Sequence, residues 1–290
     1  MNYFIWDASP EIFRIGWFAL RYYSLLFAGA ILLHYFLTAT IVRRERYRVD
    51  LDQLLMYGFW GVVIGARLGH VIFYSPDYYF SDPIRILKVW EGGLASHGAF
   101  FGFTLAVYIY CQRNILPFRL LFDICLGLQG VVFLVRLGNF FNSEIIGKPT
   151  DVPWAVVFAN VDQIPRHPAQ LYEAAGYLIV LLLVLALYFL GGIKFGNLKL
   201  LGVTLLGNSI VRFSAEFFKE SQVAFEDGMA LNMGQILSLP FFFFAIGLFF
   251  YKAKPLPRES FIIESSSSSQ STKGKEENSS RQSKKKGKKK

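Results

Sequence analysis

The densest group of polar residues in this sequence is a run from Arg136 to Gly147, which follows an apolar stretch directly. If the run is helical, Arg136, Asn139 and Asn142 fall roughly on one face, because they are spaced three residues apart. A guanidinium and two amides would then converge near the carboxylate of Glu144, and a guanidinium fork fits phosphate oxygens. The alternative is a re-entrant turn whose polar side chains satisfy its own backbone.

Other ionisable side chains stand inside apolar stretches, where each costs about 2.5–3.5 kcal/mol or more and needs a partner or a function. Arg67, Arg212 and Glu216 are of this kind. Several arginines near one face of a membrane suit an anionic headgroup. The alternatives are structural: Arg212 can pair with Glu216, four residues later on the same helical face, and Arg67 can extend toward water.

A histidine flanked by glycines opens another apolar stretch, in the run Gly-Gly-Leu-Ala-Ser-His-Gly at 92–98. Histidine titrates near neutral pH and can take a proton from a thiol, so His97 is a candidate general base. A buried histidine with a purely structural role is the alternative. A further run, His-Pro-Ala-Gln-Leu-Tyr-Glu at 167–173, begins a later apolar stretch, and its proline fits the start of a helix.

The elements that position these residues are predicted to be membrane helices. The 290 residues are 53% hydrophobic and 17% aromatic, and the apolar residues gather into blocks of about twenty, enough to cross the hydrocarbon core. The sequence therefore predicts an all-α, polytopic membrane protein with about seven transmembrane helices. The predicted spans are about 17–41, 54–74, 93–112, 119–135, 171–191, 200–218 and 233–251.

Basic residues predict how these spans are oriented. They are concentrated in the short connections 42–53, 113–119 and 192–199 and in the C-terminal tail, and such connections stay in the cytoplasm. We therefore expect the N-terminus outside and the C-terminus in the cytoplasm. The polar segment 136–170, between the fourth and fifth helices, is then expected to face outward.

The chain is predicted to consist of a transmembrane domain, 1–258, and a disordered basic cytoplasmic tail, 259–290. The tail is rich in Ser and Lys and cannot bury enough apolar surface to fold. A basic tail can indicate nucleic-acid binding, but beside a bilayer it is better explained by attraction to anionic lipid or by control of topology. We expect no nucleic-acid partner, and the sequence does not predict what the tail does.

Taken together, the polar runs resemble the motifs of the prolipoprotein diacylglyceryl transferase family, in order, over about residues 10–251. The family pattern Gly-Arg-x-Gly-Asn-Phe-x-Asn-x-Glu-x-x-Gly matches residues 135–147 except at the first position, which is Val135. The patterns at 65–69, 92–98 and 167–173 also match, as does an early aromatic pair at 22–23. In the late pattern Arg-x-x-x-Glu-x-x-Arg the last residue is Lys219, so the fork of donors is lost there.

The resemblance implies an enzyme of the bacterial inner membrane that transfers diacylglyceryl from phosphatidylglycerol to a cysteine thiol. The acceptor would be the lipobox cysteine in the signal peptide of a prolipoprotein, and the products would be a thioether and glycerol phosphate. The implied partners are phosphatidylglycerol, the prolipoprotein signal peptide and the bilayer. The resemblance implies no cofactor and no metal.

For catalysis, we assign Arg136 and Arg212 to the headgroup phosphate and Asn139 to its glycerol or phosphate oxygens. Glu144 would orient the amides. His97 would accept the proton of the thiol.

For substrate binding, Tyr23 and Arg67 would line the headgroup site, together with Asn142 and Gly147, while Glu216 would orient Arg212. The rival functions are a transporter or binding protein for an anionic lipid, and a non-catalytic membrane assembly factor. Neither rival accounts as well for polar residues that concentrate on the predicted outer side.

Overall fold

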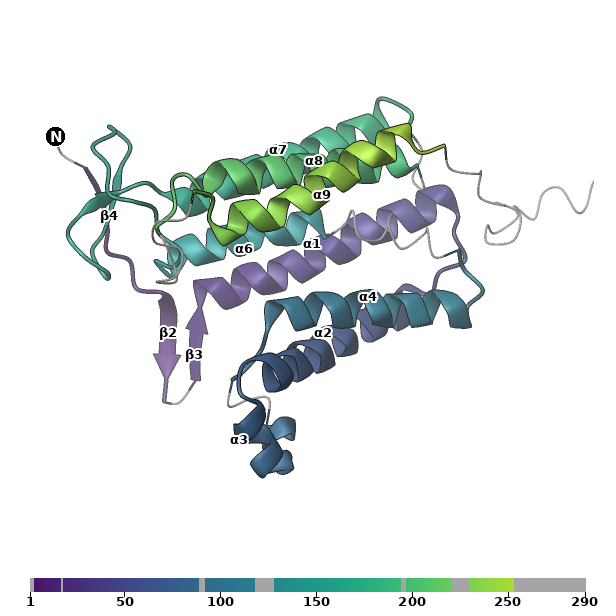
Figure 1. The fold of residues 1–290 in the computed structure, drawn as a ribbon, viewed down its shortest axis with the longest axis horizontal. Helices are drawn as coiled ribbons and strands as arrows, with labels where there is room; N and C mark the ends of the chain where they lie inside the picture. The colour runs from purple at the N-terminus through teal and green to yellow at the C-terminus, as the bar shows by residue number, and fades with distance from the viewer. Residues whose placement is uncertain are drawn as a thin grey trace, which may run out of the picture.

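The computed structural model describes residues 3–16, 18–88, 92–117, 128–193, 197–220 and 230–252. It is mostly helical, as predicted, and the long helices run side by side along the long axis of the molecule (Figure 1). The long helices are α1 (Tyr22–Glu45), α2 (Leu51–Phe73), α4 (Ser96–Arg113), α6 (Gln129–Phe141), α7 (Ala169–Phe189), α8 (Leu198–Ala215) and α9 (Met233–Phe250).

Among the described residues, four helices are long and apolar enough to cross a membrane, namely α1, α2, α7 and α9, and α6 is a shorter apolar helix. The predicted span 119–135 lies partly outside the described residues. Its described part belongs to α6, which continues beyond the predicted end to Phe141, so Arg136 lies inside the helix. Arg136 and Asn139, three residues apart, therefore lie on one face of α6.

Helices α2 and α4 pack against each other through glycines. Gly65 faces the backbone of Gly98, and Gly102 faces the backbone of Gly61 and Gly65, so that a Cβ at Gly102 would lie 2.7 Å from the Gly65 Cα. The small-residue spacing seen in the sequence thus brings two backbones together. The other helices form a second group, in which α6 packs on α1 and α7, and α8 packs on α7 and α9.

Short strands are the feature that the all-α prediction lacked. Strand β1 (Phe4–Trp6) pairs in parallel with β4 (Val156–Phe158), which pairs with β5 (Pro165–Arg166), and β2 (Glu11–Ile15) forms a hairpin with β3 (Phe18–Arg21). The N-terminal segment is held there by aromatic packing, because the Trp6 ring lies 4.7 Å from that of Phe140. Between α2 and α4 stand α3 (Pro76–Ser81) and the 3-10 helix η1 (Pro83–Leu87).

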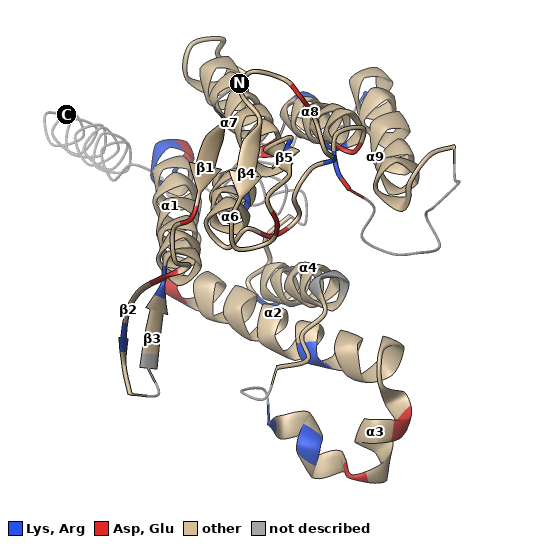
Figure 2. Ribbon diagram, turned by 90° about the vertical axis from the view of Figure 1, so that its left-hand side faces the viewer, with Lys and Arg blue, Asp and Glu red and all other residues tan. Residues whose placement is uncertain are grey.

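The N-terminus and the segment 136–170, which were predicted to face outward, lie at one end of the molecule, and the described parts of the basic connections lie at the other (Figure 1). The first end carries the N-terminal strands, α3, β4 and the connection from α6 to α7. Seen from this end, β1 and β4 cross in front of α6 and α7 (Figure 2). The tail 259–290 lies outside the described residues, so the division into two parts at 258 stays a prediction.

The glycine contact between α2 and α4 predicts a position-specific effect of added bulk. Gly102→Leu should destabilise the protein by about 1–3 kcal/mol, because a side chain there must push the α2 backbone away. Gly29→Leu is the matched control, since a Cβ at Gly29 in α1 meets nothing within 4 Å. Thermal unfolding in detergent measures both, and equal melting temperatures for the two variants would contradict the packing.

Candidate active site

The end of α6 folds a carboxylate back onto the amides of the same helix. The Arg136 Nη1 donates to Asn139 Oδ1 at 3.3 Å, and the Asn139 Nδ2 donates to Glu144 Oε2 at 3.1 Å. The Asn142 Nδ2 donates to the other oxygen of Glu144, at 3.2 Å. The expected convergence of these four side chains is therefore present in the structure, and it arises because the chain turns sharply after Asn142, with φ 54° at Ser143.

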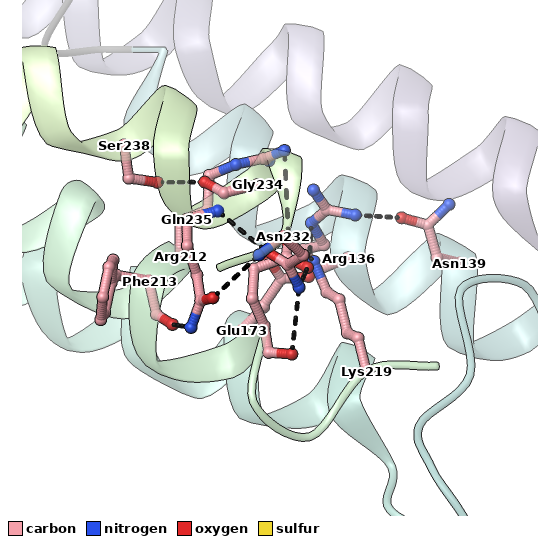
Figure 3. A network of polar contacts seen from close by, with 11 residues as sticks. Arg136, Asn139, Glu173, Arg212, Phe213, Lys219, Asn232, Gly234, Gln235 and Ser238 are labelled. Carbon is pink, nitrogen blue, oxygen red and sulfur yellow. Dashed lines mark hydrogen bonds and ion pairs between the residues drawn. The ribbon is translucent and has the colours of Figure 1, made fainter. Parts of the chain in front are cut away.

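A fully buried carboxylate on α7, that of Glu173, joins this helix end to the end of α8. Its Oε2 lies 3.1 Å from the Arg136 Nε, an ion-pair distance without hydrogen-bond geometry. Its Oε1 accepts a hydrogen bond from the Lys219 Nζ at 3.0 Å, and the same ammonium donates to Glu216 at 2.9 Å. Figure 3 shows the cations of α6 and of the segment after α8 meeting around Glu173.

Arg212 is the least engaged cation of this group. Among the described residues, its ion-pair partner is Glu216, at 4.0 Å, and its side chain is 40% exposed. The Glu216 carboxylate is held more closely by others, because Lys219 and the Asn232 Nδ2, at 3.1 Å, both donate to it. The pairing of Arg212 with Glu216 is thus present but long, which leaves the guanidinium able to bind an anion.

Gly147 stands where three segments of the chain meet. Its backbone N–H donates to the His167 carbonyl at 3.1 Å, and it forms an isolated β-bridge with Lys219. A Cβ at Gly147 would lie 2.7 Å from the Phe218 carbonyl oxygen and 2.6 Å from the His167 Cβ. Only glycine fits at this position. The run 136–147, the run 167–173 and the segment after α8 are thereby held together.

Buried Arg166 reinforces the same junction. Its Nη1 donates to the Gly147 carbonyl at 3.2 Å and to Glu220 at 2.9 Å, while its Nη2 donates to Asp162 at 2.6 Å. The hydrogen bonds from Arg166 hold the pKa of Asp162 below its ordinary value. The connection between α6 and α7 is thus fixed to the segment after α8 by charge as well as by backbone pairing.

The sequence matches a family model described as prolipoprotein diacylglyceryl transferase over residues 10–251. The chain belongs to this family. It is 44% identical over 260 residues to a relative from Tolumonas auensis, an alignment that covers 87% of this chain and 99% of the relative. Relatives from Chloroherpeton thalassium and Bacteroides fragilis are 41% and 40% identical, over 89% and 86% of this chain and 97% and 95% of their own lengths. All three are named phosphatidylglycerol–prolipoprotein diacylglyceryl transferase.

Two of the residues assigned through the family resemblance, Tyr23 and Arg67, differ in position. The Tyr23 ring lies against Gly138 of α6, beside the cluster, since a Cβ at Gly138 would be 2.7 Å from its Cδ2. Arg67, on α2, is 3% exposed, and all three of its guanidinium nitrogens donate to oxygens of the segment that joins α2 to α4. In this structure Arg67 clamps that segment, and its donors are not free for a headgroup.

His97 is the second residue of α4, but its side chain lies outside the described part of the structure. Its role as a base in the family's reaction therefore stays a prediction. The loop before α4 is held by Arg67, whose Nη1 donates to the carbonyls of Gly92 and Gly93. Arg67 thus fixes the backbone from which His97 extends.

Sequence reasoning missed Glu173 and Lys219 as members of the family's polar cluster. It treated the run containing Glu173 as the start of a helix. It treated Lys219 only as a replacement that lacks the two-pronged donor geometry of arginine. A signal was available, because a carboxylate at the start of an apolar span needs a partner. The partners could not be named in advance, since they lie 37 residues before Glu173 and 46 residues after it.

The buried ion cluster predicts a large effect of removing its central ammonium. Lys219→Met leaves Glu173 and Glu216 without the cation that joins them, and we expect a loss of about 3–5 kcal/mol in stability. Lys199→Met, at an exposed position on α8, is the matched control. Thermal unfolding of the two purified variants tests this, and a Lys219→Met protein as stable as the control would mean that the cluster contributes nothing.

Proposed function

We propose that this protein transfers diacylglyceryl from phosphatidylglycerol to the thiol of the lipobox cysteine in prolipoproteins. One observation carries the proposal: polar residues from three of the family motifs, from Arg136 to Lys219, fold into one charged cluster. The names of the relatives supply the two substrates.

The enzyme lies in the bacterial plasma membrane with seven spans, its N-terminus outside and its C-terminus in the cytoplasm. The four candidate spans support the membrane location, and the orientation is supported by the described parts of the basic connections, which lie away from the strand-bearing end (Figure 1). In this orientation the cluster at the ends of α6, α7 and α8 lies near the outer surface, at the depth of a lipid headgroup. A secreted precursor would meet the lipid there.

Arg212 and Arg136 bind the phosphate of phosphatidylglycerol. Arg212 is the more available of the two, because its side chain is 40% exposed and that of Arg136 is 15% exposed. The two guanidinium groups stabilise the charge that grows on the phosphate as the bond between glycerol carbon and oxygen breaks. The ion pair with Glu173 sets the position of Arg136, whereas Arg212 is held only at long range by Glu216.

Asn142 and Asn139 bind the headgroup oxygens, and Glu144 holds both amides in place. Each amide nitrogen donates to this carboxylate. The buried Oδ1 of Asn142 has no hydrogen-bond partner within the described part of the chain, and an unpaired acceptor of this kind suits a hydroxyl of glycerol. Gly147 shapes the turn behind these groups.

The thiol must lose its proton before its sulfur attacks the glycerol carbon. The new carbon–sulfur bond forms as the carbon–oxygen bond to phosphate breaks, so glycerol phosphate leaves and the thiol proton passes to a base. We assign that base to His97. Both substrates must meet at the same depth in the membrane. The cluster lies at the end of the helices, at the depth of the lipid headgroup, where they can do so.

The reaction predicts a product that depends on a cysteine. Purified protein in detergent with phosphatidylglycerol should add diacylglyceryl to a lipobox peptide and release glycerol phosphate, because only a thiolate is nucleophilic enough at neutral pH. The same peptide with serine at that position should gain no mass. Mass spectrometry of both peptides checks this. Folded protein that binds the lipid but modifies neither peptide would instead support a lipid-binding or transport function.

The phosphate assignment predicts the effect of removing either arginine. Arg136→Ala and Arg212→Ala should each lower turnover on the order of 10²–10³-fold, the loss typical when one donor to a developing anion is removed. Arg113→Ala is the control, because Arg113 is an exposed arginine at the opposite end of the molecule. Initial rates with the lipobox peptide measure the effect. Near-normal turnover by folded Arg136→Ala would refute the assignment.

A further inference from the structure

Two amide side chains within the helix bundle, one buried and one partly buried, donate hydrogen bonds to each other. The Gln129 Nε2 donates to Asn208 Oδ1 at 2.6 Å, and the Asn208 Nδ2 donates to Gln129 Oε1 at 2.9 Å. Gln129 is the first residue of α6 and is 3% exposed, while Asn208 is in the interior of α8. Neither residue belongs to the polar runs that the sequence analysis singled out.

The pair lies on the same faces of the two helices as the two arginines of the proposed phosphate site. Arg136 follows Gln129 by seven residues, about two turns of helix, which returns it to nearly the same face. Arg212 follows Asn208 by four residues, about one turn, which also places it on the same face. The amide pair therefore lies beneath the two guanidinium groups, further into the bundle.

Helices α6 and α8 are held together at two levels. Both pack on α7, and at the end of the bundle Glu173 of α7 joins Arg136 to Lys219, which also binds Glu216. The amide pair provides a second link, directly between α6 and α8. One link allows a helix to pivot, whereas two links at different depths fix its distance, its tilt and its rotation.

We propose that the Gln129–Asn208 pair is a positioning device that sets the separation of Arg136 and Arg212 for binding the phosphate. This inference rests on the proposed function, because it concerns the same site. A single interhelical hydrogen bond in a membrane stabilises a fold only modestly, so the fold does not depend on this pair. Catalysis is far more sensitive, since a displacement of about 1 Å at reacting groups can cost on the order of 10²-fold in rate.

The test compares four changes at the pair: Gln129→Leu, Asn208→Leu, both together, and the exchange Gln129→Asn with Asn208→Gln. Each leucine single variant should lower kcat/KM for phosphatidylglycerol on the order of 10- to 10²-fold and leave the KM for the lipobox peptide unchanged. The double leucine variant should recover the melting temperature of the unchanged protein, because no amide is left unpaired. Its turnover should stay as low as that of the single variants. The exchange variant should recover both the melting temperature and the turnover of the unchanged protein, since it keeps an amide at each position.

Thr204→Val is the matched control, because it removes a buried polar group from the same helix, one that bonds within α8 to the Leu200 carbonyl. It should leave kcat/KM unchanged. A double leucine variant with full turnover would overturn the proposal and reduce the pair to a structural contact. Single variants that lose melting temperature and keep kcat/KM per folded molecule would overturn it too.

Lipid binding separates this inference from the proposed function. The amount of phosphatidylglycerol retained by each purified variant in native mass spectrometry requires no turnover. If the unchanged protein fails to modify the peptide, yet the leucine variants retain less lipid than Thr204→Val, the pair still positions the arginines and only the transferase function fails. Equal retention in all variants, together with equal turnover, would overturn the positioning role.

Discussion

The burial of the Glu173 carboxylate is the constraint on which the site depends. A carboxylate that is fully shielded from water needs cations and hydrogen bonds in fixed positions, because an uncompensated charge there costs several kcal/mol. Arg136 comes from α6 and Lys219 from the segment after α8, so neutralising one side chain of α7 fixes the ends of two other elements. The backbone pairing at Gly147 and the ion pairs of Arg166 then complete a rigid frame.

The ion pairs around Glu173 and Glu216 contain one more cation than carboxylates. Three cations, Arg136, Lys219 and Arg212, share the two carboxylates Glu173 and Glu216. The shared contacts are shortest at Lys219 and longest at Arg212, which is also the most exposed of the three. The unbalanced charge therefore faces outward at Arg212, where an anion can bind without displacing a buried partner. Glu144 is a third carboxylate nearby, held by two amides, and within the described part of the chain it forms no ion pair with Arg212.

The sequence predicted what depends on local spacing. Arg136, Asn139 and Asn142 converge because the helical repeat brings them to one face, and Glu144 joins them through a turn of two residues. It did not predict the pairing of β1 with β4, which joins segments about 150 residues apart, or the contact of Glu173 with Lys219. Arg67 shows the same limit. Its motif was identified, but whether its donors face a lipid or backbone carbonyls depends on how a distant loop folds over it.

Lys219 shows how one departure from the family pattern fits this arrangement. An ammonium is compact and can donate to two carboxylates at once, here at 3.0 and 2.9 Å, from a position that is 5% exposed. An arginine fork would need more room and a planar partner. The Lys219 Nζ lies 2.9 Å from the Glu216 carboxylate, whereas the Arg212 Nη2 lies 4.0 Å from it. Arg212 is therefore a cation whose charge is only partly neutralised by the described part of the protein.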